Sequence, residues 1–64
     1  MNVESGAGKS RSVLILEDDR HIQELLRLAI VKSGHDVQLA STAQDAMDQF
    51  AHGFVPDLVI LDLG

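Results

Sequence analysis

The sequence predicts an α/β fold in the order strand, helix, strand, helix, strand, with a parallel three-stranded sheet between the two helices. Two apolar runs, at 12–16 and 58–63, have the composition of strands buried on both faces, and only Asp62 interrupts the second run. Two stretches with helical spacing of apolar residues, at 20–33 and 43–52, separate the three extended segments. Crossovers that contain a helix connect parallel strands and are right-handed.

The first strand is predicted over Ser12–Leu16, and a helix follows it over 20–33. Asp19 stands just before this helix, where its carboxylate can accept hydrogen bonds from unpaired backbone N–H groups. One apolar face is predicted from residues at helical spacing: Ile22, Leu25, Leu26, Ala29 and Ile30. Gly34 stands where a residue of left-handed conformation ends a helix.

The second strand, at 35–40, is predicted at an edge of the sheet. Val37 and Leu39 alternate with polar residues, as in a strand with one face in water. Ser41 and Gln44 have the spacing of a capping box for the second helix, at 43–52, and Gly53 is its predicted terminator.

The order of the strands in the sheet follows from their hydrophobicity. The first and third strands are the most apolar, so we expect them side by side, with the strand at 35–40 outside the first. This spatial order, 2-1-3, places the two helices on opposite faces. It also makes the space between the first and third strands a topological switch point, where ligands bind in doubly wound folds.

Composition excludes several classes of function. The 64 residues carry 5 Lys plus Arg against 10 Asp plus Glu, a formal charge of -5, so we expect no direct binding to nucleic acid. The absence of cysteine excludes disulfides and thiolate metal sites. No apolar run approaches the ~18 residues of a membrane span, so we expect a cytoplasmic protein with no membrane segment. Residues 1–11 are polar and small, and are predicted to be a disordered leader before a domain at 12–64.

Acidic residues follow both predicted buried strands. Asp62 near the end of the third strand is costly to bury unless it is solvated, paired or bound to a cation. Glu17 and Asp18 follow the first strand, and the carboxyl ends of neighbouring parallel strands lie about 4.8 Å apart. Carboxylates this close repel one another, and a divalent cation relieves the repulsion, which favours a Mg²⁺ site.

Other interpretations of the acidic residues are open at this point. A solvated acidic rim would need no ligand. Calcium binding is compatible with the donors, but the chain has no twelve-residue calcium loop. Acid–base catalysis on sugars is disfavoured because the chain has no Trp or Tyr to form a sugar-binding platform.

Four segments together resemble a known family. They are VLILEDD at 13–19, GHDV at 34–37, ASTAQDA at 40–46 and PDLVILDL at 56–63. With this spacing, residues 12–64 resemble the receiver domain of bacterial two-component response regulators. The resemblance implies that Asp62 is the phosphoacceptor and that Asp18 binds Mg²⁺ directly beside it. Glu17 stands where many members carry Asp and would act through water.

The resemblance also implies a phosphoryl donor, and it implies that the chain corresponds to only part of the family fold. The phosphoryl donor would be a sensor histidine kinase or a phosphotransfer protein, and the chain would not itself be an enzyme. The family fold is flavodoxin-like with strand order 2-1-3-4-5, so this chain corresponds to its N-terminal half, a truncated doubly wound unit. Its third strand would then be an open apolar edge, which predicts that the chain either folds poorly alone or self-associates as a two-fold homodimer. Such a dimer could pair through the third strand, or each copy could replace the half that the other lacks. The alternative function is therefore a non-catalytic, self-associating structural module.

Overall fold

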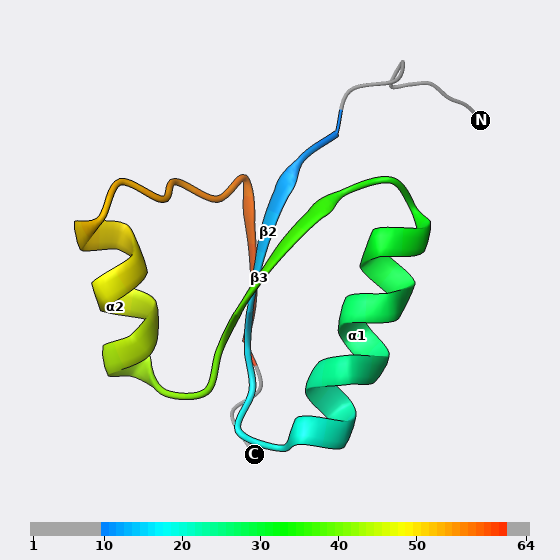
Figure 1. Ribbon diagram of the computed structural model, residues 1–64, viewed down its shortest axis with the longest axis horizontal. Coiled ribbons are helices and arrows are strands. Elements are labelled where there is room, and N and C mark those ends of the chain that lie inside the picture. The colour runs from blue at the N-terminus through cyan, green and yellow to red at the C-terminus, as the bar shows by residue number, and fades with distance from the viewer. Residues whose placement is uncertain (1–9, 62–64) are drawn as a thin grey trace.

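The computed structural model describes residues 10–61. Its elements are β2 (Ser12–Leu16), α1 (Arg20–Lys32), β3 (Asp36–Ala40), α2 (Ala43–Ala51) and β4 (Leu58–Leu61). The strands form one parallel sheet in the order β3-β2-β4. The helices flank this sheet on opposite sides (Figure 1). The predicted fold class, a truncated flavodoxin-like β-α-β-α-β unit with strand order 2-1-3, is confirmed.

The central strand β2 is the most deeply buried element. Val13, Leu14 and Ile15 are 2%, 1% and 0% exposed, which agrees with the prediction that this apolar strand lies inside the sheet. It pairs in register on both sides, and its last residue, Leu16, stands opposite Ala40 of β3 and Leu61 of β4. All three strands therefore end at the same edge of the sheet.

The start of α1 follows the prediction. Asp19 is the N-cap, and its Oδ1 accepts hydrogen bonds from the backbone N–H groups of His21 at 2.8 Å and Ile22 at 3.2 Å. The helix ends one residue earlier than predicted, with Ser33 as its C-cap. Gly34 follows with a φ of 88°, the left-handed conformation that was predicted there.

The predicted capping box of α2 is wrong by one residue. Thr42, not Ser41, is the N-cap, and its Oγ1 accepts the N–H of Asp45 at 3.0 Å. Asp45 in turn accepts the N–H of Ser41 at 3.2 Å. Both hydroxyl residues can cap a helix, and the third residue after Thr42 is a carboxylate, which accepts the N–H of the residue before the cap.

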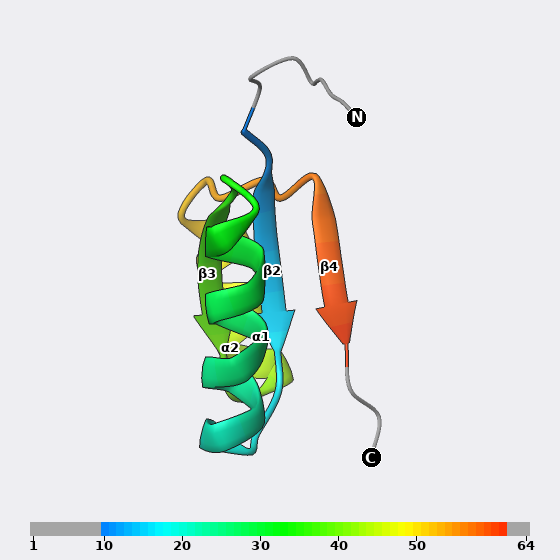
Figure 2. The ribbon, with the colours of Figure 1, turned by 90° about the vertical axis from the view of Figure 1, so that its right-hand side faces the viewer.

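The helices cover only part of the sheet. Both contact β3 and β2, and within residues 10–61 neither contacts β4 (Figure 2). On the α2 side, Leu14, Ala40 and Ala46 form a buried cluster against which Leu16 and Phe54 pack. Neither helix of this part of the chain is long and apolar enough to cross a membrane.

The predicted apolar face of α1 is divided. Leu26 and Ile30 are half-buried, whereas Ile22 is 41% exposed and Leu25 is 67% exposed. The helix lies over β3 and β2, so only the part of its apolar stripe that faces these strands is covered. The rest of the stripe is left uncovered by residues 10–61.

Candidate functional site

The candidate site lies at the carboxyl ends of β2 and β4. The pairing of these strands ends with Leu16 opposite Leu61. Glu17 and Asp18 follow β2 directly, and Asp62 is the next residue in the sequence after β4. Asp62 itself lies outside the described residues. The geometry of the site can therefore be described for its β2 half.

Glu17 is the buried carboxylate of this site. The residue is 3% exposed, and its Oε2 accepts the N–H of Asp19 at 2.9 Å. Its own N–H donates to the carbonyl of Ala40 at 3.0 Å, which extends the contact between β2 and β3 by one residue. A buried carboxylate is costly unless it is hydrogen-bonded. This bond to Asp19 also turns the chain from β2 into α1.

The three consecutive carboxylates divide between the interior and the solvent. Asp18 and Asp19 are exposed, while Glu17 is buried. Asp19 is occupied by its N-cap bonds to α1. Of the three acids, Asp18 is therefore the one that is exposed to solvent and does not cap α1.

Gln23 is a site residue that the sequence did not reveal. Its Nε2 donates to the carbonyl of Glu17 at 3.1 Å and lies 3.5 Å from the carbonyl of Ala40. It therefore joins the ends of β2 and β3 to the first turns of α1. The only signal in the sequence is its place one turn after the N-cap Asp19, and that spacing does not distinguish a bridging amide from a surface one.

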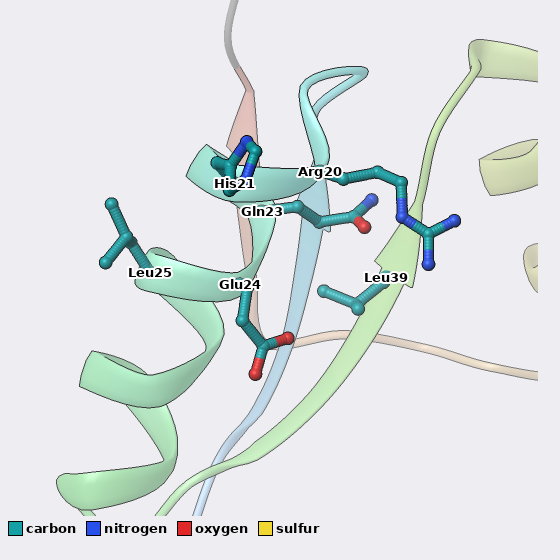
Figure 3. A pocket seen from close by; sticks show the side chains of 6 residues that line it. All are labelled: Arg20, His21, Gln23, Glu24, Leu25 and Leu39. Carbon is teal, nitrogen blue, oxygen red and sulfur yellow. The ribbon is translucent and has the colours of Figure 1, made fainter.

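A hollow of about 520 Å³ opens beside Gln23, between the start of α1 and β3. Its lining residues are Arg20, His21, Gln23, Glu24, Leu25 and Leu39. Arg20, Gln23 and Glu24 point toward β3, whereas His21 and Leu25 point to the other side of the helix (Figure 3). The polar lining and the apolar Leu39 belong to the helix–sheet junction that positions Glu17.

The donors present are of the kind that Mg²⁺ prefers. Glu17 and Asp18 provide hard carboxylate oxygens, which suit Mg²⁺ better than a soft metal. Within residues 10–61, no group of three or more His, Cys, Asp or Glu side chains could hold a metal. The predicted set of Glu17, Asp18 and Asp62 includes one residue beyond this range, so it stays a prediction.

The fold and the acidic strand end define a receiver-type α/β unit. The chain is 37% identical over 51 residues to the response regulator MprA of Mycobacterium sp. (strain KMS), which is 80% of this chain and 22% of that protein. It is 36% identical over 52 residues to the virulence transcriptional regulatory protein PhoP of Salmonella typhimurium (strain LT2), covering 81% of this chain and 23% of that protein. These similarities to response regulators, over about 80% of this chain, support the interpretation of the described unit as part of a receiver domain.

This chain spans about a fifth of the length of the curated relatives that it matches. No family model matches the chain. No solved structure matches it.

Proposed function

We propose that the chain is a phosphoacceptor module of a two-component signalling system, in which Asp62 receives a phosphoryl group. The observation that carries the proposal is the parallel pairing of β2 and β4, which ends with Leu16 opposite Leu61. Glu17 and Asp18 follow β2 at this edge, and Asp62 is the next residue in the sequence after β4, which supports a shared acidic site. The similarity to response regulators supports the same assignment.

The proposed reaction is the transfer of a phosphoryl group from a phosphohistidine on a histidine kinase or a phosphotransfer protein. A carboxylate oxygen of Asp62 attacks the phosphorus atom, and a new P–O bond forms. The P–N bond of the donor breaks, and its electron pair returns to the imidazole nitrogen. The product is an acyl phosphate on this chain, which is modified once and is not an enzyme that turns over.

The acidic residues around Asp62 would hold Mg²⁺. Asp18, which is exposed at the end of β2, is the proposed direct ligand beside Asp62, and Glu17 would act through water. When bound, Mg²⁺ supplies positive charge that offsets the repulsion between carboxylates and phosphoryl oxygens. Glu17 also has a structural part in the described residues, because its bond to Asp19 fixes the turn that presents Asp18.

The absence of cysteine and the response-regulator relatives fit a cytoplasmic location, which we propose for this module. The net charge of -5 opposes direct contact with nucleic acid by these residues. Any output would then be exerted through other parts of a longer protein or through partners.

The phosphoacceptor is tested with the full chain, acetyl phosphate as donor and Mg²⁺ in the buffer. Intact mass spectrometry should show the gain of one phosphoryl group, and hydroxylamine should remove it because it cleaves acyl phosphates. The Asp62→Asn variant should lose this gain. Asp36→Asn is the matched control, because Asp36 is an exposed carboxylate at the start of β3, at the other end of the sheet. Equal labelling of the wild type and D62N would refute the assignment.

Metal binding is tested separately by titrating Mg²⁺ alone and following backbone amide resonances. The resonance shifts should be largest at residues 17–19. The affinity for Mg²⁺ should be at least tenfold weaker in Asp18→Asn. D36N should bind as the wild type does. If D18N binds Mg²⁺ with unchanged affinity, Asp18 is not a ligand.

The second candidate function is self-association without phosphoryl transfer. The observation that favours it is the exposure of β4, in which Leu58 is 54% and Leu61 is 53% exposed. The argument for this surface is independent of the acidic site.

A further inference from the structure

Gln23 of α1 is hydrogen-bonded to the residues on both sides of Asp18. Its Nε2 donates to the carbonyl of Glu17 at 3.1 Å, and its backbone N–H donates to the carbonyl of Asp19 at 2.9 Å. The residue is half-buried, and its side chain points toward β3 (Figure 3). One residue of α1 therefore brackets the exposed acid that is the proposed direct ligand of Mg²⁺.

Both peptide groups that flank the Cα atom of Asp18 are held by side-chain hydrogen bonds. The carbonyl of Glu17 and the N–H of Asp18 belong to one planar group, and the carbonyl of Asp18 and the N–H of Asp19 belong to the next. Gln23 holds the first group through the Glu17 carbonyl. Oε2 of Glu17 holds the second group through the N–H of Asp19 at 2.9 Å. Because φ and ψ of Asp18 are the only soft torsions between the two groups, both are restrained.

The sheet itself does not supply the bond to the Glu17 carbonyl. β3 ends at Ala40, whose carbonyl accepts the N–H of Glu17 at 3.0 Å. A continued parallel ladder would next pair the Glu17 carbonyl with the N–H of residue 42. Thr42, however, is the N-cap of α2. The amide of Gln23 takes the place of this missing rung, and its Nε2 lies 3.5 Å from the Ala40 carbonyl as well.

We propose that Gln23 is a positioning residue of the acidic site, whose amide fixes the backbone at Asp18 and so directs the Asp18 carboxylate before a cation binds. The part of this inference that concerns Mg²⁺ rests on the proposed function. Gln23 is not itself a proposed ligand, because its effect passes through the peptide group between Glu17 and Asp18.

This restraint matters for the ion that the site is proposed to hold. Mg²⁺ requires near-ideal octahedral geometry, so its affinity is sensitive to the direction in which a carboxylate leaves the backbone. Asp18 is exposed, and no hydrogen bond to another described residue orders its carboxylate before binding. A backbone that is ordered beforehand lowers the entropy that binding costs. Gln23 would thus act on affinity and leave the identity of the ligands unchanged.

The first test uses the full chain without metal and measures the order parameters of backbone amides by ¹⁵N relaxation. The amides of Asp18 and Asp19 should have values of about 0.85 in the wild type, as rigid backbone does, and should fall toward about 0.6 in Gln23→Met. Methionine has a similar length but no N–H donor. Gln23→Arg keeps N–H donors at this position and should restore the wild-type values. The amide of Ala46, within α2, should be the same in all three chains.

The second test titrates Mg²⁺ alone into the folded chain and follows the amide resonances. The affinity of Q23M should be about tenfold weaker than that of the wild type, at the lower end of the effect of outer-shell partners. Gln44→Met is the matched control, because the Gln44 amide donates to Asp48 at the surface of α2, and it should bind as the wild type does. The Q23R chain is left out of this titration, since its added positive charge would itself repel the cation.

The two measurements separate a structural role from a positioning role. Unchanged order parameters at Asp18 and Asp19 in Q23M would overturn the proposal. A Q23M chain that is less stable to heat but binds Mg²⁺ as tightly as the wild type would also overturn it, because Gln23 would then only stabilise the fold.

The same measurements distinguish a failure of this inference from a failure of the proposed function. A wild-type chain without Mg²⁺-induced shifts at residues 17–19 would show that the proposed metal site is wrong, and the metal-free order parameters would still decide whether Gln23 holds Asp18. If D18N loses affinity as expected while Q23M matches the wild type, the metal site stands and the positioning role of Gln23 is refuted.

Discussion

Ser12 and Asp57, 45 residues apart in the sequence, hold the first residues of β2 and β4 together by two reciprocal hydrogen bonds. The N–H of Ser12 donates to Oδ2 of Asp57 at 2.8 Å, and the N–H of Asp57 donates to the carbonyl of Ser12 at 2.7 Å. The pair lies at the opposite end of the sheet from Glu17. It fixes the alignment of β4, so that Leu61 reaches the level of Leu16.

We expect Asp57→Ala to lower the free energy of unfolding by about 1 kcal/mol, because the Ser12 N–H loses its charged acceptor at an exposed position. Asp57→Asn retains an acceptor oxygen and should cost less than half as much. Asp36→Ala, at an exposed strand start, is the control. Urea denaturation followed by circular dichroism measures all three, and equal losses in D57A and D36A would contradict the role of the pair.

The N-cap of α1 gives a second prediction. Asp19→Ala removes the acceptor of two backbone N–H groups and should destabilise the chain by about 1 kcal/mol. Asp19→Ser should recover most of this loss, because a serine hydroxyl also caps helices. Thermal unfolding can rank the variants against Asp18→Ala, for which we expect almost no change. A D19S variant as unstable as D19A would show that the cap bond contributes little.

Gln49 of α2 bonds the Leu39 carbonyl of β3. Gln49→Leu should lower the free energy of unfolding by about 1 kcal/mol, because the Leu39 carbonyl loses its hydrogen bond. Gln44→Leu is the matched control on the same helix, since its amide bonds only to Asp48 at the surface. Chemical denaturation of both variants tests this difference. Comparable stability of Q49L and Q44L would mean that water replaces the amide without cost.

The ion pair between Glu24 and Arg27 predicts a pH effect. The hydrogen bond from Arg27, and then its charge, hold the pKa of the Glu24 carboxyl below its ordinary value of 4.5. Because the folded pKa is depressed, this contribution to stability is present above pH 4.5 and is lost as pH falls through the folded pKa. The Glu24 side chain is 52% exposed and the Arg27 side chain is 35% exposed, so solvent screens the pair and the effect is small.

A titration of the Glu24 side-chain carboxyl carbon by NMR measures this shift. In Arg27→Gln the pKa of Glu24 should return to its ordinary value. Lys32→Gln, which removes a charge farther along α1, should leave the shift in place. An unchanged titration of Glu24 in R27Q would show that Arg27 is not its cause.

Patterns within short stretches of sequence predicted much of the architecture. The apolar runs located β2 and β4, and the alternation at Val37 and Leu39 placed β3 at the edge. Asp19 and Gly34 marked the ends of α1 because caps and left-handed residues depend on neighbours within one turn. The disordered leader at 1–11 and the roles of Asp62 stay predictions.

The candidate site was only partly predictable. Three consecutive acids indicated a cluster, but only the folded chain shows Glu17 buried and bonded to Asp19, with Asp18 in solvent. The bridging role of Gln23 depends on the distance between the helix and two strand ends, which the spacing of residues along α1 does not encode.

The sequence by itself determined the order of elements, the parallel sheet and the position of acids after two apolar strands, because these follow from local hydrophobic periods and chain connectivity. Tertiary structure decided which carboxylate is buried, which part of the α1 stripe is covered and which carbonyl at the β3 edge is bonded by α2. The reason is that each of these depends on a partner distant in the sequence. Gln49 bonds the outward carbonyl of Leu39 at the β3 edge, whereas β4 pairs only with β2 among the described strands.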